Sequence, residues 1–185
     1  MERRSFLKRM THLLGALFGA VIGIPALSFL IDPRHRPAPD GAFKRVARLS
    51  DLGGKTPDPV VIRQVVVRDI RRDAWTLHPN DVLGRVWLVR RGDAVEAYTT
   101  ICPHLGCSIN FEEKSHRFIC PCHGGTFDIS CHRVAEEDLG RTNPAPRDMD
   151  ALEIRTVEIP GEDDSVIEVK YENYVEGRPD RVKKT

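Results

Sequence analysis

The sequence lacks an excess of charge of either sign: its 185 residues include 28 Lys and Arg against 27 Asp and Glu, a formal net charge of +1. This balance gives no reason to expect a nucleic-acid partner or a general attraction to acidic surfaces. Internal repeats and low-complexity tracts are also absent from the sequence. The length allows one ordinary domain with its own core and an appendage of several tens of residues.

Cysteine is scarce as well. The five cysteines are too few for a small scaffold that disulfides hold together. No Cys-x-x-Cys-His pattern occurs, which excludes a covalently attached c-type haem. Four of the five cysteines nevertheless fall between Cys102 and Cys122, and this concentration indicates a local chemical site.

A long apolar run extends over residues 10–31, and His12 is its one strongly polar member. A helix of this length, at about 1.5 Å per residue, would span roughly 30 Å, the thickness of a bilayer core, and Pro25 can be tolerated in it as a kink. Because the run is apolar on every face, a buried soluble helix is disfavoured. The run also ends without the Ala-x-Ala kind of cleavage site of a signal peptide. We therefore expect one retained transmembrane anchor.

Gly15, Gly19 and Gly23 recur at four-residue spacing within this run and form a stripe of small residues. Two interpretations are open: ordinary composition of a membrane helix, or close contact with a helix of a partner subunit.

Residues 1–9 are expected to be a cytoplasmic N-terminus. Arg3-Arg4-Ser5-Phe6-Leu7-Lys8 resembles the twin-arginine export signal, with Glu2 where that pattern usually has Ser or Thr. Positive charges on the two sides of the span balance, so the orientation rests on this motif. It implies a bacterial cytoplasmic membrane, with the rest of the chain on the periplasmic or extracytoplasmic side.

Residues 32–43 are expected to form a tether. Asp32 to Gly41 is rich in Pro and Arg, and we expect that it cannot continue the helix and is instead extended and semi-rigid.

Residues 44–185 are expected to form a mostly antiparallel β head. The β-branched run Val60 to Val67 is typical of a strand. Apolar segments on either side of Gly92-Asp93 and of Pro160 to Asp164 indicate two hairpins. A short helical turn is expected near Ala135 to Leu139.

Two short segments carry the chemistry: Cys102-Pro103-His104-Leu105-Gly106-Cys107 and Cys120-Pro121-Cys122-His123-Gly124-Gly125. The ordered pattern, Cys-x-His followed by Cys-x-x-His, resembles the two boxes of the Rieske family. The resemblance implies an all-β Rieske head, with antiparallel sheets and a cluster-binding subdomain, that holds one 2Fe-2S cluster. By resemblance the ligands are Cys102 and Cys120 on one iron and His104 and His123 on the other.

The residue types fit this chemistry. Two thiolates stabilise the iron that stays ferric, whereas two neutral imidazoles leave the other iron easier to reduce. Each imidazole can bind iron through one ring nitrogen and expose the other, which couples the uptake of an electron to that of a proton. We expect one of His104 and His123 to be the catalytic contact with the substrate, and the sequence does not choose between them.

The resemblance also implies a disulfide between Cys107 and Cys122, as in the membrane-bound branch of the family. Such a bridge fits an oxidising compartment, and soluble oxygenase-type Rieske ferredoxins lack it. A zinc site of two Cys and two His would explain neither the extra cysteine pair nor the glycines and prolines of both boxes. Cys131 is left over, and we expect a buried, unpaired thiol.

Asn143-Pro144-Ala145-Pro146 resembles the proline-rich loop that covers the cluster in this family, although Ser130 to Thr142 is longer than the resemblance leads us to expect. High-potential members have Ser at the position of Gly125 and Tyr at that of Phe127, and both hydroxyls donate hydrogen bonds to sulfur. Because these donors are missing, we expect a potential toward the bottom of the roughly −150 to +300 mV Rieske range. A menaquinol pool is the corresponding hypothesis.

The whole chain resembles the Rieske subunit of a quinol:cytochrome c oxidoreductase, a cytochrome bc-type complex of the respiratory chain. The resemblance implies a subunit, not catalytic alone, that oxidises quinol with release of protons. Its partners would be a cytochrome b subunit and a c-type cytochrome, within a dimeric hetero-oligomeric complex in which the head swings on the tether. The alternative is the small subunit of an arsenite oxidase-like molybdoenzyme, which relays electrons without quinol. The retained anchor and tether favour the first.

Overall fold

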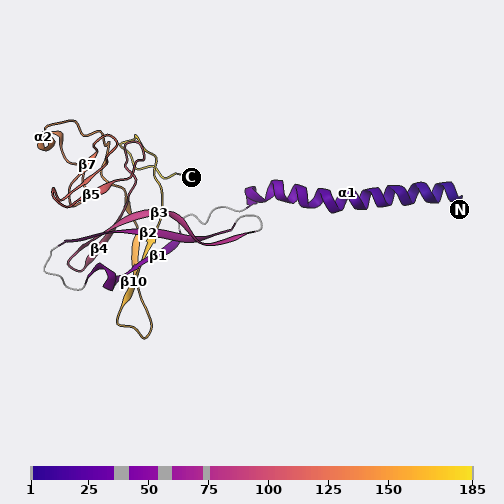
Figure 1. Cartoon of the computed structure of the whole chain (residues 1–185), viewed down its shortest axis with the longest axis horizontal. Helices are drawn as coiled ribbons and strands as arrows, with labels where there is room; N and C mark the ends of the chain where they lie inside the picture. The colour runs from indigo at the N-terminus through magenta and orange to yellow at the C-terminus, as the bar shows by residue number, and fades with distance from the viewer. Residues whose placement is uncertain (1, 36–41, 54–59, 73–75, 185) are drawn as a thin grey trace. The chain divides into compact units, whose positions relative to one another are not determined.

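The computed structural model describes residues 2–35, 42–53, 60–72 and 76–184 (Figure 1). Its first element is the helix α1 (Arg3–His35). Over Arg3–Ile31 the helix is long and apolar enough to cross a membrane, and none of this stretch is buried by the rest of the chain. A side chain added at Gly15, Gly19 or Gly23 would meet nothing within 4 Å. The described part of the chain thus contains one helix of membrane-spanning length, as the sequence predicts.

The end of this helix differs from the expectation. Residues 32–35 are helical, so the prediction that Asp32 and Pro33 already belong to an extended tether is wrong. A proline removes only its own N–H donor from the helical ladder, and near a helix end the neighbouring residues keep their helical conformation. Residues 36–41 of the expected tether lie outside the described residues, and its last residue, Phe43, already belongs to the first strand, β1 (Phe43–Arg48).

The described residues of the head form three small sheets, with strand orders β1-β10-β9, β2-β3-β4-β8 and β5-β6-β7. The strands β1 and β10, β10 and β9, β3 and β4, β4 and β8, β5 and β6, and β6 and β7 pair antiparallel. In chain order the elements are β1 (Phe43–Arg48), η1 (Leu49–Leu52), β2 (Val60–Arg72), β3 (Leu77–Arg91), β4 (Ala94–Thr99), β5 (Asn110–Glu112), β6 (Arg117–Ile119), β7 (Thr126–Phe127), α2 (Glu136–Leu139), β8 (Ala151–Leu152), β9 (Ile154–Glu158) and β10 (Ser165–Lys170).

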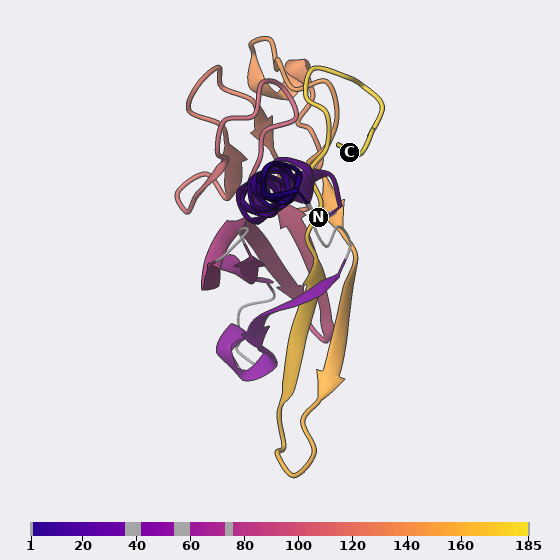
Figure 2. The ribbon, with the colours of Figure 1, turned by 90° about the vertical axis from the view of Figure 1, so that its right-hand side faces the viewer.

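The predicted turns lie where the sequence placed them. Arg91 pairs with Ala94 around Gly92, which has a φ of +59°, and Ser165 pairs with Glu158 across the second turn. The single turn of α2 ends at Gly140 in the left-handed region. The all-β head with antiparallel sheets is confirmed. Figure 2 shows the β9–β10 turn and the β5-β6-β7 sheet at opposite ends of the head.

Strand β3 joins two hydrophobic cores. Its residues 86–89 are all buried, and side chains alternate along a strand, so the two sheet faces receive different residues. Val86 and Leu88 pack in one core with Leu52, Val67, Leu152, Ile167 and Val169. Trp87 and Val89 pack in the other core with Cys102, Ile109, Phe118, Cys120, Phe127, Cys131, Ala145 and Met149.

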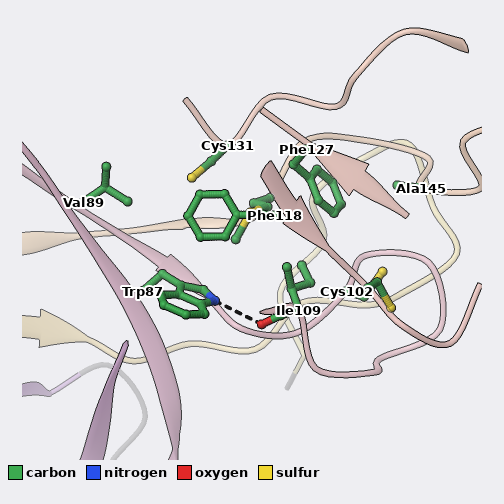
Figure 3. Packing of buried hydrophobic residues seen from close by; sticks show 10 residues of the cluster. Trp87, Val89, Cys102, Ile109, Phe118, Phe127, Cys131 and Ala145 are labelled. Carbon is green, nitrogen blue, oxygen red and sulfur yellow. Dashed lines mark hydrogen bonds between the residues drawn. The ribbon is translucent and has the colours of Figure 1, made fainter. Parts of the chain in front are cut away.

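The second core positions the loops that follow. Trp87 Nε1 donates a hydrogen bond of 3.1 Å to the Ile109 carbonyl, as Figure 3 shows. The Trp87 ring also meets the Phe118 ring edge-on, with the two centroids 5.4 Å apart. Ile109 lies two residues after the end of the first cysteine loop, and Phe118 lies two residues before the start of the second. One tryptophan on the central sheet therefore fixes the stems of both loops.

Candidate metal centre

The first cysteine loop is a tight turn closed at its base. Ile101 and Ser108 form an isolated β-bridge across it. The Cys102 N–H donates to the Cys107 carbonyl at 2.8 Å, and the Gly106 N–H donates back to the Cys102 carbonyl at 2.9 Å. Gly106 has a φ of +83°, a left-handed conformation that glycine adopts without strain.

The second loop repeats this pattern of backbone hydrogen bonds. The Cys120 N–H donates to the Gly125 carbonyl at 2.8 Å, and the Gly124 N–H donates to the Cys120 carbonyl at 3.0 Å. Gly124 takes the left-handed role, with a φ of +73°. In both loops the first residue is a buried cysteine, at 1% and 2% exposure. Each loop thus holds one cysteine sulfur rigidly on its inner side.

The two buried cysteines lie close together. A Cβ built at Gly125 would be 3.4 Å from Cys102 Sγ and 3.6 Å from Cys120 Cβ. Both cysteines therefore lie beside this glycine, which has no side chain of its own. Burial raises the pKa of the Cys102 thiol; the N–H groups of His104 and Leu105 oppose this rise, and the nearby Cys120 adds to it. A thiolate that has lost its hydration in this way requires a compensating cation. The pair is suited to binding a metal.

The two histidines come from the same two loops. The His104 and His123 ring centroids are 5.0 Å apart, and the ring planes are nearly perpendicular at 87°. His104 is half-buried, whereas His123 is exposed. The structure therefore brings the two predicted histidine ligands next to each other, as it does the two predicted cysteine ligands.

A disulfide ties the loops to each other. Cys107 and Cys122 form this bond, as the sequence comparison with the membrane-bound branch implied. The Sγ atoms of Cys107, Cys120 and Cys122 all lie within 4.8 Å of one another. Because two of these sulfurs are bonded to each other, they cannot act as thiolate ligands. Only Cys120 of the three is free to bind metal, and the disulfide lies directly beside it.

The proline-rich loop lies against the same pair of cysteines. Its Ala145 Cβ would be 3.8 Å from a Cβ built at Gly125. Asn143, only 3% exposed, holds the loop in place. Its side-chain amide donates to the Thr126 and Val134 carbonyls at 2.7 and 2.9 Å, and its oxygen accepts from the Thr126 N–H at 3.2 Å.

Sequence reasoning missed the C-terminal segment. The Gly177 N–H donates to the Pro103 carbonyl at 2.8 Å, and the Glu176 carboxylate lies 3.1 Å from a Cβ built at Gly106. Arg147 anchors the segment, because its Nη1 donates to the Arg178 carbonyl at 2.6 Å. Nothing in the residue pattern signals these contacts, because they are made by backbone groups and by charged residues that look like ordinary surface residues in the sequence.

Cys131 is a free, buried thiol, as expected. It lies in the second core at 1% exposure, and its carbonyl accepts from the Met149 N–H at 3.0 Å. Burial raises the pKa of this thiol to about 12, which makes it a poor nucleophile. Its role is packing.

Comparison with known families gives the site its context. Residues 61–160 match the model of the Rieske [2Fe-2S] domain. This chain belongs to the Rieske family. A Rieske domain binds one [2Fe-2S] cluster, which requires two cysteine and two histidine ligands, and the two loops carry residues of both types.

Curated relatives of this Rieske protein carry similar descriptions. It is 27% identical over 135 residues to the menaquinol:cytochrome c reductase iron-sulfur subunit of Bacillus subtilis (strain 168), which covers 69% of this chain and 74% of the relative. It is 26% identical over 129 residues to the cytochrome b6-f complex iron-sulfur subunit of Chlorobaculum thiosulfatiphilum, covering 70% of this chain and 60% of the relative. The cytochrome bc1 complex Rieske iron-sulfur subunit of Streptomyces lividans is 36% identical over 55 residues, 29% of this chain and 32% of the relative.

Among solved structures, the cyanobacterial plasma membrane Rieske protein PetC3 from Synechocystis PCC 6803 is 27% identical, with a TM-score of 0.35. That match covers 51% of this chain and 85% of the solved chain.

Proposed function

We propose that this Rieske protein is the electron-transfer subunit of a quinol:cytochrome c oxidoreductase of the bc type. The observation that carries the proposal is the pair of cluster loops joined by the Cys107–Cys122 disulfide, in a chain that also has a membrane-spanning helix. The relatives' descriptions as subunits of a menaquinol:cytochrome c reductase and of cytochrome b6-f and bc1 complexes support it.

The ligand assignment follows from the donors. Cys102 and Cys120 would hold one iron through their buried sulfurs, and His104 and His123 the other. The cluster, when bound, would supply a one-electron acceptor. The protein's own part is to keep the sulfurs dry and to present an imidazole to the substrate.

His123 is the better candidate for the contact with quinol. It is exposed while His104 is half-buried, so a quinol hydroxyl can approach His123 more freely. The ring nitrogen that does not bind iron would accept a hydrogen bond from this hydroxyl and then its proton. Leu105, 63% exposed beside His104, offers an apolar surface suited to a lipid-soluble substrate and its pocket.

Differential chemical modification tests this assignment. We expect diethyl pyrocarbonate to modify His123 faster than His104 in the cluster-loaded full chain, as read by peptide mapping. Faster modification of His104 would assign the quinol contact to the first loop instead.

We further propose menaquinol as the substrate pool. Position 125, where a hydroxyl would reach Cys102 Sγ, holds a glycine, and the fully buried ring of Phe127 carries no hydroxyl. Hydrogen bonds to cluster sulfur stabilise the reduced state, so their absence lowers the potential. Protein-film voltammetry of the full chain in detergent should give a midpoint in the lower part of the Rieske range. A midpoint near +300 mV would exclude a low-potential quinol.

The membrane arrangement is part of the same proposal. Residues 1–9 would lie in the cytoplasm and the head on the opposite side, exported through the twin-arginine route, where the head would swing between a cytochrome b subunit and a c-type cytochrome in a dimeric complex. Mild solubilisation followed by affinity purification of the full chain should recover a b-type cytochrome and quinol-dependent cytochrome c reduction. Recovery of a molybdenum protein without a b-type cytochrome would favour the arsenite oxidase-like alternative.

A further inference from the structure

Arg141 lies in the segment between the second cluster loop and the proline-rich loop, directly after α2 and Gly140. Its Nη2 donates a hydrogen bond of 2.9 Å to Thr126 Oγ1. Thr126 is 1% exposed, and its hydroxyl donates in turn to the Gly124 carbonyl at 2.9 Å. The charged end of an exposed arginine is thus anchored, through one buried hydroxyl, to the turn that carries His123.

Gly124 makes room for this guanidinium. A Cβ built at Gly124 would lie 2.9 Å from Arg141 Nη1, closer than real Cβ contacts allow. The second loop therefore needs glycine here for its left-handed backbone and also for the approach of the positive charge. As a result the guanidinium lies directly against the residue that follows His123.

The charge of Arg141 also differs from that of its neighbours in its pairing among the described residues. Two other arginines bind the segments beside the cysteine loops. Arg133, which donates to the proline-rich loop, pairs with Glu136 at 3.0 Å, and Arg147, which donates to the C-terminal segment, pairs with Asp150 at 2.8 Å. Within the described part of the chain, Arg141 has no carboxylate partner. Its other hydrogen bond goes to the Thr142 carbonyl at 3.2 Å. Of the three guanidiniums, only this one presents a net positive charge to the loop.

We infer that Arg141 is a tuning residue that raises the reduction potential of the cluster. Reduction adds one negative charge, so a fixed neighbouring cation stabilises the reduced state more than the oxidised state. Arginine stays protonated at every relevant pH, and its anchored head loses little of this effect to motion. Arg141 therefore partly offsets the lowering of the reduction potential that results from the missing hydroxyls at positions 125 and 127. The inference rests on the Rieske cluster and not on the identity of the quinol.

The test compares midpoint potentials of the cluster-loaded full chain in detergent. Arg141→Gln and Arg141→Met remove the charge with side chains of different polarity, whereas Arg141→Lys keeps it. Arg45→Gln is the matched control, because Arg45 is an exposed arginine on β1, in the sheet that carries neither cysteine loop. We expect both neutral variants to shift the midpoint downward, Arg141→Lys to retain most of the wild-type value, and Arg45→Gln to leave it unchanged.

Salt provides a second readout, because screening weakens the interaction of an exposed charge. The difference between wild type and Arg141→Gln should shrink as ionic strength rises. An unchanged midpoint in the neutral variants would overturn the inference, as would an equal fall in Arg141→Lys, which would indicate a role in packing only. Loss of the cluster from both neutral variants would also overturn it, because a structural requirement would then replace tuning. The wild-type midpoint tests the low-potential proposal separately, since the inference concerns only differences from it.

Discussion

The two cluster loops have the same backbone and different surroundings. Both close with a hydrogen bond from the first cysteine to the sixth residue and another from the fifth residue, a left-handed glycine, back to the first. The histidine, however, is the third residue of the first loop and the fourth residue of the second. This shift of one residue accompanies a half-buried His104 and an exposed His123.

The neighbours of the loops differ as well. The C-terminal segment covers the first loop, with the Glu176 carboxylate next to Gly106. The second loop instead meets the proline-rich loop and the guanidinium of Arg141. A repeated turn is therefore enough to place two thiolates, whereas what surrounds each turn decides which imidazole faces outward and which charge the cluster senses.

The largest effect is expected when the buried cysteine that begins each loop is replaced. Cys102→Ser and Cys120→Ser should each abolish cluster binding, because a serine hydroxyl is not deprotonated to a soft anionic ligand at neutral pH. Iron content and the EPR spectrum of the reduced chain measure this loss. Cys131→Ala is the control, since its buried sulfur lies in the same core but takes no part in ligation. Retention of a Rieske EPR signal in either serine variant would refute the ligand assignment.

The second largest effect is expected when the disulfide that joins the two loops is removed. The double variant Cys107→Ala, Cys122→Ala opens a bridge between residues 15 apart, a closure that stabilises a protein by about 3 kcal/mol. Thermal unfolding of the cluster-loaded chain should show the loss, together with faster release of iron. Treatment with a reductant should lower the stability of the wild type and leave the double variant unaffected. Equal stability of the two without reductant would mean that the protein contacts alone hold the loops together.

A smaller effect is expected when a hydrogen-bond donor is introduced into the second loop. Gly125→Ser places a hydroxyl beside Cys102 Sγ, because the added Cβ would lie 3.4 Å from this sulfur, an ordinary contact distance. A hydrogen bond to the reduced cluster worth about 1.4 kcal/mol corresponds to about 60 mV for one electron. We expect voltammetry to show a rise of that order. Gly125→Ala fits the same space without a donor, so an equal rise in that variant would assign the shift to exclusion of water.

Much of this arrangement could be predicted from the sequence. Spacing and residue type singled out both boxes, because metal ligation and tight turns each demand particular residues at particular offsets. The disulfide partners and the proline-rich loop followed only from the resemblance of these boxes to the Rieske family. The β3–β4 and β9–β10 hairpins were predictable for the same reason, since their turns require residues such as Gly92.

The missed features depend on tertiary contacts. The helix continues through Asp32 and Pro33, because proline weakens a helix without ending it at once. Arg141 and Glu176 look like ordinary surface charges in the sequence, and only folding brings them to Gly124 and Gly106. The greater exposure of His123 likewise depends on which segments pack beside each loop, and local patterns do not carry that information.

The smallest effect is expected when a negative charge beside the first loop is removed, the opposite of the change in Arg141→Gln. Glu176→Gln removes the carboxylate beside the first loop and leaves Lys184, its partner at 2.6 Å, unpaired. The local charge becomes more positive, so the midpoint should rise slightly, opposite to the fall expected for Arg141→Gln and smaller than the shift for Gly125→Ser. Glu172→Gln, which removes the partner of Lys183 in the same segment, should leave the midpoint unchanged.

The Glu176 carboxylate should also make the stability of the protein depend on pH. The hydrogen bond from Lys184 lowers the pKa of Glu176 below its ordinary 4.5, so the folded state favours the charged form. The resulting stabilisation is complete above the ordinary pKa and is lost as the pH falls through the lowered one. The difference in thermal midpoint between wild type and Glu176→Gln should therefore be constant near neutrality and shrink below about pH 4.5. A difference that persisted at lower pH would show that Glu176 supports the first loop by packing and not by its charge.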